Sequence, residues 1–365
     1  MKKRVKVGVI TIWDIDNYGN RLQNYALLTI IKKLGYDSYT LKVWPQSYLK
    51  RAFQYITNYD VSILRILKER LEGNVRKANF LLFEKKNIPK DRRFYNCKYD
   101  KKLLNKKYSI IVVGSDQIWH PVFLKNKNFF PTFANSIINT ISYAASIGVS
   151  QLNEVDKINL RDGLRYIKHI SVRETQAASI ISDLGMNTPE VVLDPTMLID
   201  KNEWSNLEIK PSYAEKKYLL VYFLGEISEE RLQLIDKISK EYQLQIITLG
   251  DRKYSEIYTA GPAEFLFLFH HATLIFTDSF HGCVFSILFN SPFYVFSRED
   301  RLENMSSRID TLLAYFNLQN RIVDDVSTSI SLTYDFTLCD KQLLDLRAKS
   351  INFLKTALLD SNNEV

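Results

Sequence analysis

A single histidine stands between an apolar run and an apolar helix in the segment TDSFHGCVFSILFN. The chain has only five histidines, and core packing at this junction would favour Leu or Val. At the start of a helix, His281 can act as an acid, as a base or as a hydrogen-bond donor to phosphate near neutral pH, and the helix amides attract an anion. The alternative is a histidine that is satisfied within the core. We interpret His281 as a site residue.

The motif GSDQIWHP offers a carboxylate, an amide and an indole directly after the most apolar run of the first half. The site residues that we predict from it are Ser115, Asp116, Gln117 and Trp119. The alternative is that Asp116 caps the next turn and that Trp119 fills the core.

The motif DIDNYGNRLQ lies at a predicted strand-to-helix turn, where a glycine permits tight backbone geometry and free amides can hold an anion. It matches neither the dinucleotide-binding glycine pattern nor a P-loop. The alternative is that the asparagines cap the helix and that the Arg and Gln lie on the surface. The candidate acceptor-binding or anion-binding residues are Asn17, Gly19, Asn20, Arg21 and Gln23.

Arginines form a third group of candidates. Arg173, in the motif SVRE, ends a predicted strand, where its guanidinium could grip a carboxylate or phosphate; a surface ion pair with Glu174 or an Asp is the alternative. Arg298, Arg301 and Arg308 follow the His281 segment, and we expect at least one of them to reach the ligand. His270 and His271 close the preceding helix and are predicted to act as C-terminal capping cations, whereas DPTML, with Thr196, is weighed as mainly structural.

The elements that must position these residues alternate between strands and helices, which predicts an α/β fold with parallel sheets. Two such series suggest two Rossmann-like domains that face each other across a cleft, with ligands beyond the carboxyl ends of the strands. The expected domains are residues 1–190 (N-terminal, acceptor side), 191–335 (C-terminal, donor side) and a C-terminal helix, 336–365. The basic and apolar start of the chain is predicted to be a strand and not a signal peptide.

Composition narrows the class of protein. The 365 residues are 46% hydrophobic, and three widely spaced cysteines predict free thiols. No stretch is apolar for long enough to span a membrane, so we expect a cytoplasmic protein. The net charge of +8 favours anionic ligands. Basic residues crowd positions 50–107, which we interpret as a solvated or membrane-facing surface and not as a nucleic-acid groove.

The motifs NYGNRLQ, GSDQIW, SVRE, DPTML and TDSFHG, in this order, resemble the polysaccharide pyruvyl transferase family from about residue 6 to residue 316. The resemblance implies a pair of Rossmann-type domains of the glycosyltransferase-B kind, phosphoenolpyruvate as the donor and two hydroxyls of a sugar as the acceptor. The histidine of the family's HG motif corresponds to His281 and the arginine of its VR[DE] motif to Arg173, both expected at the donor. Many relatives carry an arginine where this chain has Ser279.

This resemblance leads to a functional hypothesis in which a pyruvate ketal forms on a cell-surface glycan or its lipid-linked precursor, with release of phosphate. We expect Arg173, Ser279, Gly282 and the later arginines to bind the donor. His281 stabilises phosphate or donates a proton, and Asp116 and Glu174 are candidates for activating the acceptor. No cofactor and no metal are expected. A peripheral membrane surface and a second copy of the chain are further candidate partners. The alternatives are a nucleotide-sugar glycosyltransferase and a non-catalytic glycan-binding or anion-binding protein.

Overall fold

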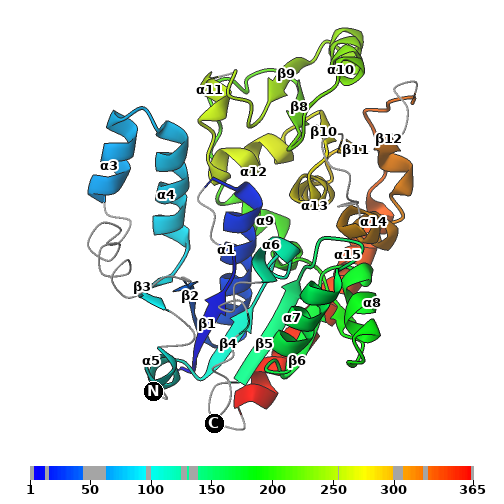
Figure 1. Ribbon diagram of the computed structural model, residues 1–365. Coiled ribbons are helices and arrows are strands. Elements are labelled where there is room, and N and C mark those ends of the chain that lie inside the picture. The colour runs from blue at the N-terminus through cyan, green and yellow to red at the C-terminus, as the bar shows by residue number, and fades with distance from the viewer. Residues whose placement is uncertain are drawn as a thin grey trace. The chain divides into compact units, whose positions relative to one another are not determined.

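The chain divides into two compact units in the computed structural model (Figure 1). Unit 1 comprises residues 1–68, 84–198 and 346–365, and unit 2 comprises residues 69–83 and 199–345. The boundary between the series therefore lies near residue 198, and part of the C-terminal helix groups with unit 1, whereas the sequence suggests a division at residue 190 and a separate helix. The structure describes residues 4–12, 16–43, 63–95, 100–124, 130, 139–253, 255–298, 307–323 and 328–362.

Unit 1 is built on a seven-stranded sheet with the strand order β3-β2-β1-β4-β5-β6-β7. Every neighbouring pair is parallel, and the central strands are apolar because both faces are covered. The strands are β1 (Lys6–Ile10), β2 (Asp37–Val43), β3 (Lys90–Tyr95), β4 (Ile110–Val113), β5 (Asn139–Ala145), β6 (His169–Val172) and β7 (Glu190–Val191). The start of the chain thus forms a strand, as the sequence predicts.

The helices of unit 1 connect these parallel strands. They are α1 (Tyr18–Lys33), α5 (Lys101–Lys107), α6 (Pro121–Leu124), α7 (Glu154–Leu164), α8 (Thr175–Asp183) and the 3₁₀ turn η2 (Pro195–Leu198). Asn17 caps the start of α1 by accepting a hydrogen bond from the amide of Asn20, and Lys32 and Lys33 lie in its last turn, where cations are favoured. The helix α1 is the first helix after β1, and Gln23 Nε2 in α1 donates to Thr11 Oγ1 next to the end of β1 at 2.8 Å, which holds the first turns of α1 at the carboxyl edge of the sheet.

Unit 2 is built on a second parallel sheet with the strand order β12-β11-β10-β8-β9. The strands are β8 (Tyr218–Tyr222), β9 (Gln245–Thr248), β10 (Leu274–Thr277), β11 (Phe293–Phe296) and β12 (Ile322–Val323). The helices are α9 (Lys201–Ser205), α10 (Glu229–Tyr242), α11 (Ser255–Tyr258), α12 (Pro262–His270), α13 (Phe280–Phe289), α14 (Ser307–Tyr315) and the turn η3 (Gln319–Arg321). Two parallel α/β sheets are therefore confirmed.

Three helices contribute residues to both units: α3 (Ile63–Leu71), α4 (Val75–Asn87) and α15 (Thr337–Asn362). The second part of α15 packs against the sheet of unit 1, where the rings of Phe353 and Tyr143 lie 6.5 Å apart (Figure 1). Ser350 Oγ accepts a hydrogen bond from the amide of Leu193 at 3.0 Å. Arg347 Nε donates to the carbonyl of Met197 at 2.8 Å. These bonds fix the end of α15 to the segment that follows β7.

Two strands were not predicted from the sequence, β3 and β12. Both lie at a sheet edge, and β3 has the sequence KDRRFY, in which charged residues alternate poorly with apolar ones. Charge on β3 hides its strand character, because edge strands tolerate charged residues. The strand β12 is only two residues long, which is too short to give a periodic pattern.

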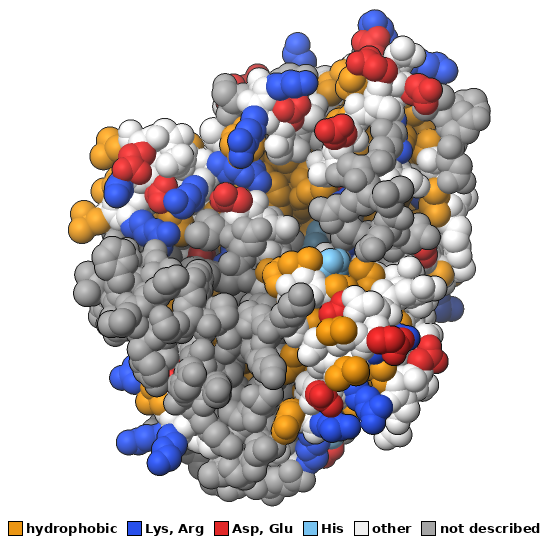
Figure 2. Space-filling model, in the orientation of Figure 1, with side chains coloured by type: hydrophobic (Ala, Val, Ile, Leu, Met, Phe, Trp, Pro, Cys, Tyr) orange, Lys and Arg blue, Asp and Glu red, His pale blue; other side chains and the backbone are white. Residues whose placement is uncertain are grey.

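Surface charge, the cysteines and the length of the apolar helices can each be compared with the expectations from composition. Acidic and basic side chains are interspersed over α10, including the exposed pair of Lys240 and Asp236 at 2.5 Å (Figure 2). Cys283 and Cys339 are free and buried, and burial raises the pKa of the Cys283 thiol, so the thiol form is favoured; Cys97 lies outside the described residues. None of the helices in the described part of the chain is both long and apolar enough to cross a bilayer.

A buried carboxylate anchors the edge strand β3 to the rest of unit 1. Asp91 accepts hydrogen bonds from Tyr95 Oη at 2.6 Å, Tyr108 Oη at 2.5 Å and Lys107 Nζ at 2.7 Å. Burial alone would raise the pKa of Asp91, but the hydrogen bonds from Lys107, Tyr108 and Tyr95 outweigh it and lower the pKa below its ordinary value. The ionised form of Asp91 therefore stabilises the fold.

We expect Asp91→Asn to lower the free energy of unfolding at neutral pH by about 1–3 kcal/mol, because charge-assisted hydrogen bonds are lost. The folded-state pKa of Asp91 is depressed, so its contribution is present above the unfolded value of about 3.9 and disappears as the pH falls through the lower folded value. Urea unfolding across this range should show the gap between wild type and variant closing in acid. A gap that stays constant, or an equal gap for the exposed Asp162→Asn control, would contradict this assignment.

Candidate functional site

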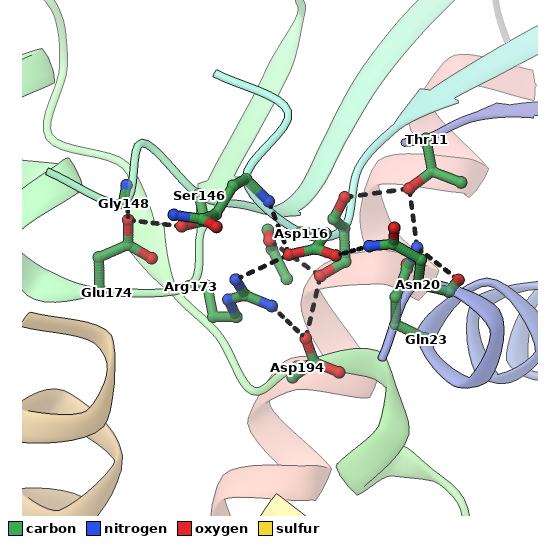
Figure 3. Close-up of polar contacts among 12 residues, drawn as sticks. Thr11, Asn20, Gln23, Asp116, Ser146, Gly148, Arg173, Glu174 and Asp194 are labelled. Carbon is green, nitrogen blue, oxygen red and sulfur yellow. Dashed lines mark hydrogen bonds and ion pairs between the residues drawn. The ribbon is translucent and has the colours of Figure 1, made fainter. Parts of the chain in front are cut away.

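A polar cluster lies at the carboxyl ends of β1, β4, β5 and β6 in unit 1 (Figure 3). Thr11 follows β1, Asp116 follows β4, Ser146 follows β5 and Arg173 follows β6. Parallel strands bring their carboxyl ends to one edge of a sheet, which is why four segments distant in sequence meet here. We call this group the unit 1 cluster; it also contains Asn20, Gln23, Ser115, Glu174 and Asp194.

Arg173 is buried at the centre of the unit 1 cluster. Its Nη1 donates to Asp194 Oδ2 at 2.7 Å and its Nη2 to Asp116 Oδ1 at 3.3 Å. Burial alone would lower the pKa of Arg173, but the carboxylates of Asp116, Asp194 and Glu174 raise it. The guanidinium is therefore held by internal carboxylates, in contrast to the sequence-based interpretation, in which it is open to a donor anion or forms a surface pair.

Asp116 occupies a backbone conformation that few residues adopt. Its φ of 72° lies in the left-handed region, which Asp tolerates better than most residues. One carboxylate oxygen accepts a hydrogen bond from the amide of Gln117 at 2.8 Å, and the other accepts one from Asn20 Nδ2. Asp116 is 6% exposed, and the bond from the Gln117 amide agrees with the alternative in which Asp116 caps the turn that follows β4.

Glu174 organises the loop that follows β5. Its Oε1 accepts hydrogen bonds from Ser146 Oγ at 2.9 Å and from the amides of Ile147 at 2.9 Å and Gly148 at 3.1 Å. The residue is 1% exposed and stands at the start of α8. One oxygen of the carboxylate thus has a structural role, and only Oε2 is left for the acceptor-activating role that the sequence suggests.

Other predicted residues of unit 1 make hydrogen bonds within the unit 1 cluster or lie at the start of α1. Gln23 Nε2 donates to Thr11 Oγ1 at 2.8 Å and to the carbonyl of Asn20 at 3.2 Å. Ser115 Oγ lies 3.1 Å from the carbonyl oxygen of Ala144 and 3.2 Å from Asp194 Oδ2. Asn17 is the exposed N-cap of α1, as one interpretation predicts, and Gly19 is buried in the first turn of α1.

Two predicted ligand contacts are instead internal. Trp119 has no exposed surface and stacks on Phe130 with ring centroids 6.2 Å apart, so the interpretation as a core residue describes it better than a ligand platform. Arg21 is buried and pairs with Glu84 at 3.5 Å, and Lys90 Nζ lies 2.5 Å from the same carboxylate. Neither side chain meets a ligand without rearrangement.

The predicted residues of unit 2 gather at the turn from β10 into α13. Ser279 is the N-cap of α13, and its hydroxyl accepts a hydrogen bond from the amide of Gly282 at 3.4 Å. His281 lies in the first turn with 9% of its surface exposed, and its ring meets Phe280 edge-on at 5.3 Å. The residue that replaces an arginine of the relatives thus caps the helix that carries the histidine.

Asp278, in the TDSFHG segment, fixes the loop beside this turn, although it was not among the site residues predicted from that segment. Its carboxylate accepts hydrogen bonds from the amides of Leu224 at 2.7 Å and Gly225 at 2.9 Å, and it pairs with Arg298 at 3.4 Å. The guanidinium of Arg308 lies 5.8 Å from the ring centroid of Phe280. Two of the predicted arginines therefore come close to the turn, and Arg301 lies outside the described residues. The signal for Asp278 was its place directly after a buried strand.

Thr11 is a member of the unit 1 cluster that the sequence did not reveal, whereas Asp194 lies in a segment that was predicted to be mainly structural. Asp194 belongs to the DPTML segment, and its Oδ1 accepts hydrogen bonds from the amide of Thr196 at 3.0 Å and its hydroxyl at 2.7 Å. It is thus a structural carboxylate that also neutralises Arg173.

Comparison with known families shows to which family the chain belongs. A family model described as polysaccharide pyruvyl transferase matches residues 17–300, a span that includes the turn from β10 into α13 and every member of the unit 1 cluster except Thr11. The chain belongs to this family. No curated protein matches the sequence.

Several solved structures are similar to this pyruvyl transferase family member at low sequence identity. The UDP-GlcNAc 2-epimerase from Methanocaldococcus jannaschii is 14% identical, with 94% of this chain and 93% of that chain covered and a TM-score of 0.46. The UDP-GlcNAc 2-epimerase from Neisseria meningitidis is 10% identical, with 100% of both chains covered and a TM-score of 0.48. A putative UDP-N-acetylglucosamine 2-epimerase from Listeria monocytogenes is 11% identical, with 97% and 91% covered and a TM-score of 0.49.

Proposed function

We propose that the protein transfers the pyruvate unit of phosphoenolpyruvate to two hydroxyls of a sugar in a cell-surface polysaccharide or its lipid-linked precursor, with release of phosphate. The observation that carries the proposal is the match to the polysaccharide pyruvyl transferase family over residues 17–300. The geometry of each unit supports a division of labour between donor and acceptor.

The turn between β10 and α13 suits the donor. The start of a helix attracts phosphate, and His281 lies in this first turn. An imidazole can donate a hydrogen bond or a proton to the departing phosphate. Arg298 pairs with Asp278 at the same loop, which reduces the repulsion that the carboxylate would exert on an anionic ligand at the start of α13.

The unit 1 cluster suits a hydroxyl-bearing acceptor. Its ionisable groups are the carboxylates of Asp116, Glu174 and Asp194 and the guanidinium of Arg173, so the sum of these charges is negative. A negative site disfavours a second phosphate or carboxylate, but it accepts hydrogen bonds from sugar hydroxyls. We therefore assign Asp116, rather than Arg173, to ligand contact, with Arg173 holding the carboxylate in place.

The reaction can be written without a cofactor beyond phosphoenolpyruvate as co-substrate. A proton adds to the methylene carbon, and the first sugar hydroxyl attacks the carbon that bears the phosphate, losing its proton to a base. The second hydroxyl then attacks the same carbon while the carbon–oxygen bond to phosphate breaks, and the proton of this hydroxyl passes to the departing phosphate. Inorganic phosphate leaves with the electron pair of that bond, and the two sugar oxygens close the ketal ring.

The test is glycan-dependent turnover of phosphoenolpyruvate by the purified full chain. Protein is incubated with phosphoenolpyruvate and a panel of glycans, and inorganic phosphate and the product mass are measured. We expect phosphate release only when a suitable glycan is present, with a ketal on that glycan. A parallel panel of nucleotide sugars is the control. Release of nucleotide without turnover of phosphoenolpyruvate would reject the proposal in favour of a glycosyltransferase.

A further inference from the structure

Two adjacent histidines and a glutamate meet in unit 2, within the layer formed by α9, α12 and α13. The sequence predicts that His270 and His271 cap α12 as cations. In the structure, His270 lies in the last turn of α12 and His271 is its C-cap residue. In addition, His270 Nδ1 lies 2.7 Å from Glu208 Oε1, and His271 Nε2 lies 3.1 Å from Glu208 Oε2. The carboxylate thus faces both imidazoles, and its side chain is only 10% exposed.

The neighbours of this group hold its rings in place. The ring of His270 stacks on Phe289 at 4.5 Å, and the ring of His271 stacks on Phe267 at 4.2 Å. The residue after Glu208 is tied to α12, because its amide donates to the carbonyl of Ala263 at 3.2 Å. Side chains whose rotamers are fixed by packing lose little entropy when they bind an ion, so the group is preorganised.

We propose that Glu208, His270 and His271 bind one divalent transition metal ion of the zinc type. One ligand atom from each residue lies within 4.8 Å of the others. A tetrahedral zinc ion needs ligand atoms about 3.3 Å apart, given metal–ligand distances of about 2.0–2.2 Å. The separations of 2.7 Å and 3.1 Å between the Glu208 oxygens and the imidazole nitrogens are both shorter than this, so small side-chain rotations would have to widen the group around an ion.

The donor set selects the class of metal. Two imidazole nitrogens and one carboxylate oxygen suit zinc, copper, nickel or cobalt, whereas calcium and magnesium prefer oxygen ligands throughout. His270 is 31% exposed and His271 is 47% exposed, so an ion can enter from solvent and keep a water as the fourth ligand. The bound ion would join the segment after α9 to the end of α12, and it is distinct from the groups that we assign to pyruvyl transfer.

The test uses cobalt as a spectroscopic probe. The metal-free full chain is titrated with Co²⁺, and the visible absorption of tetrahedral cobalt is followed; Zn²⁺ is then added in competition. We expect one equivalent of Co²⁺ to bind, Zn²⁺ to displace it, and Zn²⁺ to raise the melting temperature. His271→Ala and Glu208→Gln should each weaken the affinity about tenfold or more, because a ligand is lost.

His169→Ala is the matched control. His169 pairs with Asp360 at 3.8 Å, but among the described residues only the Glu208 group brings three ligands together. This control should bind Co²⁺ as tightly as wild type. Three outcomes would overturn the proposal: wild type that binds no stoichiometric ion, His271→Ala and Glu208→Gln variants that bind like wild type, or an equal loss in the control. His271 is half exposed, so its removal leaves the fold intact for the measurement.

Discussion

Replacing His281 with alanine is expected to lower glycan-dependent phosphate release by about 10²–10⁴-fold, the range lost when a general acid or base is removed. The imidazole lies in the first turn of α13, where the helix dipole favours the phosphate that must leave. Ser279 still caps the helix in this variant, because its hydroxyl bonds to the Gly282 amide and not to the imidazole. The loss should therefore fall on turnover.

The measurement is the rate of phosphate release at saturating phosphoenolpyruvate and glycan, with far-ultraviolet circular dichroism to show that the variant is folded. His169→Ala is the control, because His169 lies on β6, the strand that leads to Arg173, and is not among the groups assigned to the reaction. His281→Gln keeps a hydrogen-bond donor but cannot transfer a proton, so it separates the two roles of the imidazole. Wild-type turnover in His281→Ala would remove His281 from the site.

Arg173→Ala is expected to destabilise unit 1 by about 3–5 kcal/mol, because it leaves buried carboxylates without their compensating charge. The side chain of Arg173 is 1% exposed, and its partners Asp116 and Asp194 are 9% and 0% exposed at the side chain. A guanidinium that only gripped a donor would give a different result, a stable variant with weakened substrate binding. Stability therefore discriminates between the two roles.

Hydrogen exchange of the amides of β4, β5 and β6 measures the loss of stability within unit 1 separately from the stability of unit 2. The matched control is Arg165→Ala, which removes an exposed pair with Asp162 at 3.4 Å and should cost less than about 1 kcal/mol. If these amides exchange as slowly in Arg173→Ala as in Arg165→Ala, the ion pairs of Arg173 do not stabilise the unit 1 cluster.

The sequence predicted those strands and helices that show a hydrophobic pattern within their own residues. The strands β4, β8 and β10 are buried on both faces and were read as apolar runs, and the helices between them follow from apolar periodicity. The rule that ligands lie beyond strand ends also placed Asp116 and Arg173 at one sheet edge. The edge strands carry no such signal, because β3 is rich in charged residues and β12 is only two residues long.

Pairing between distant residues could not be predicted in the same way. Arg173 is satisfied by Asp194, Arg21 by Glu84, and the two histidines of α12 by Glu208. Each partner comes from another element, and only the three-dimensional fold decides which carboxylate a buried cation meets. A sequence pattern therefore identifies charged residues at strand ends but does not distinguish a ligand contact from an internal ion pair.

The path of the chain through unit 1 has a consequence for biosynthesis. Its sheet is complete at β7, yet the segment after β7 is held by Arg347 and Ser350 of α15, and Asn139 of β5 donates to the carbonyl of Ser361 at 2.8 Å. Residues 199–345 of unit 2 are translated between these two parts. During translation, unit 2 can therefore fold before unit 1 is complete. The sheet of unit 1 gains its contacts with α15 only after residues 346–362 have been synthesised.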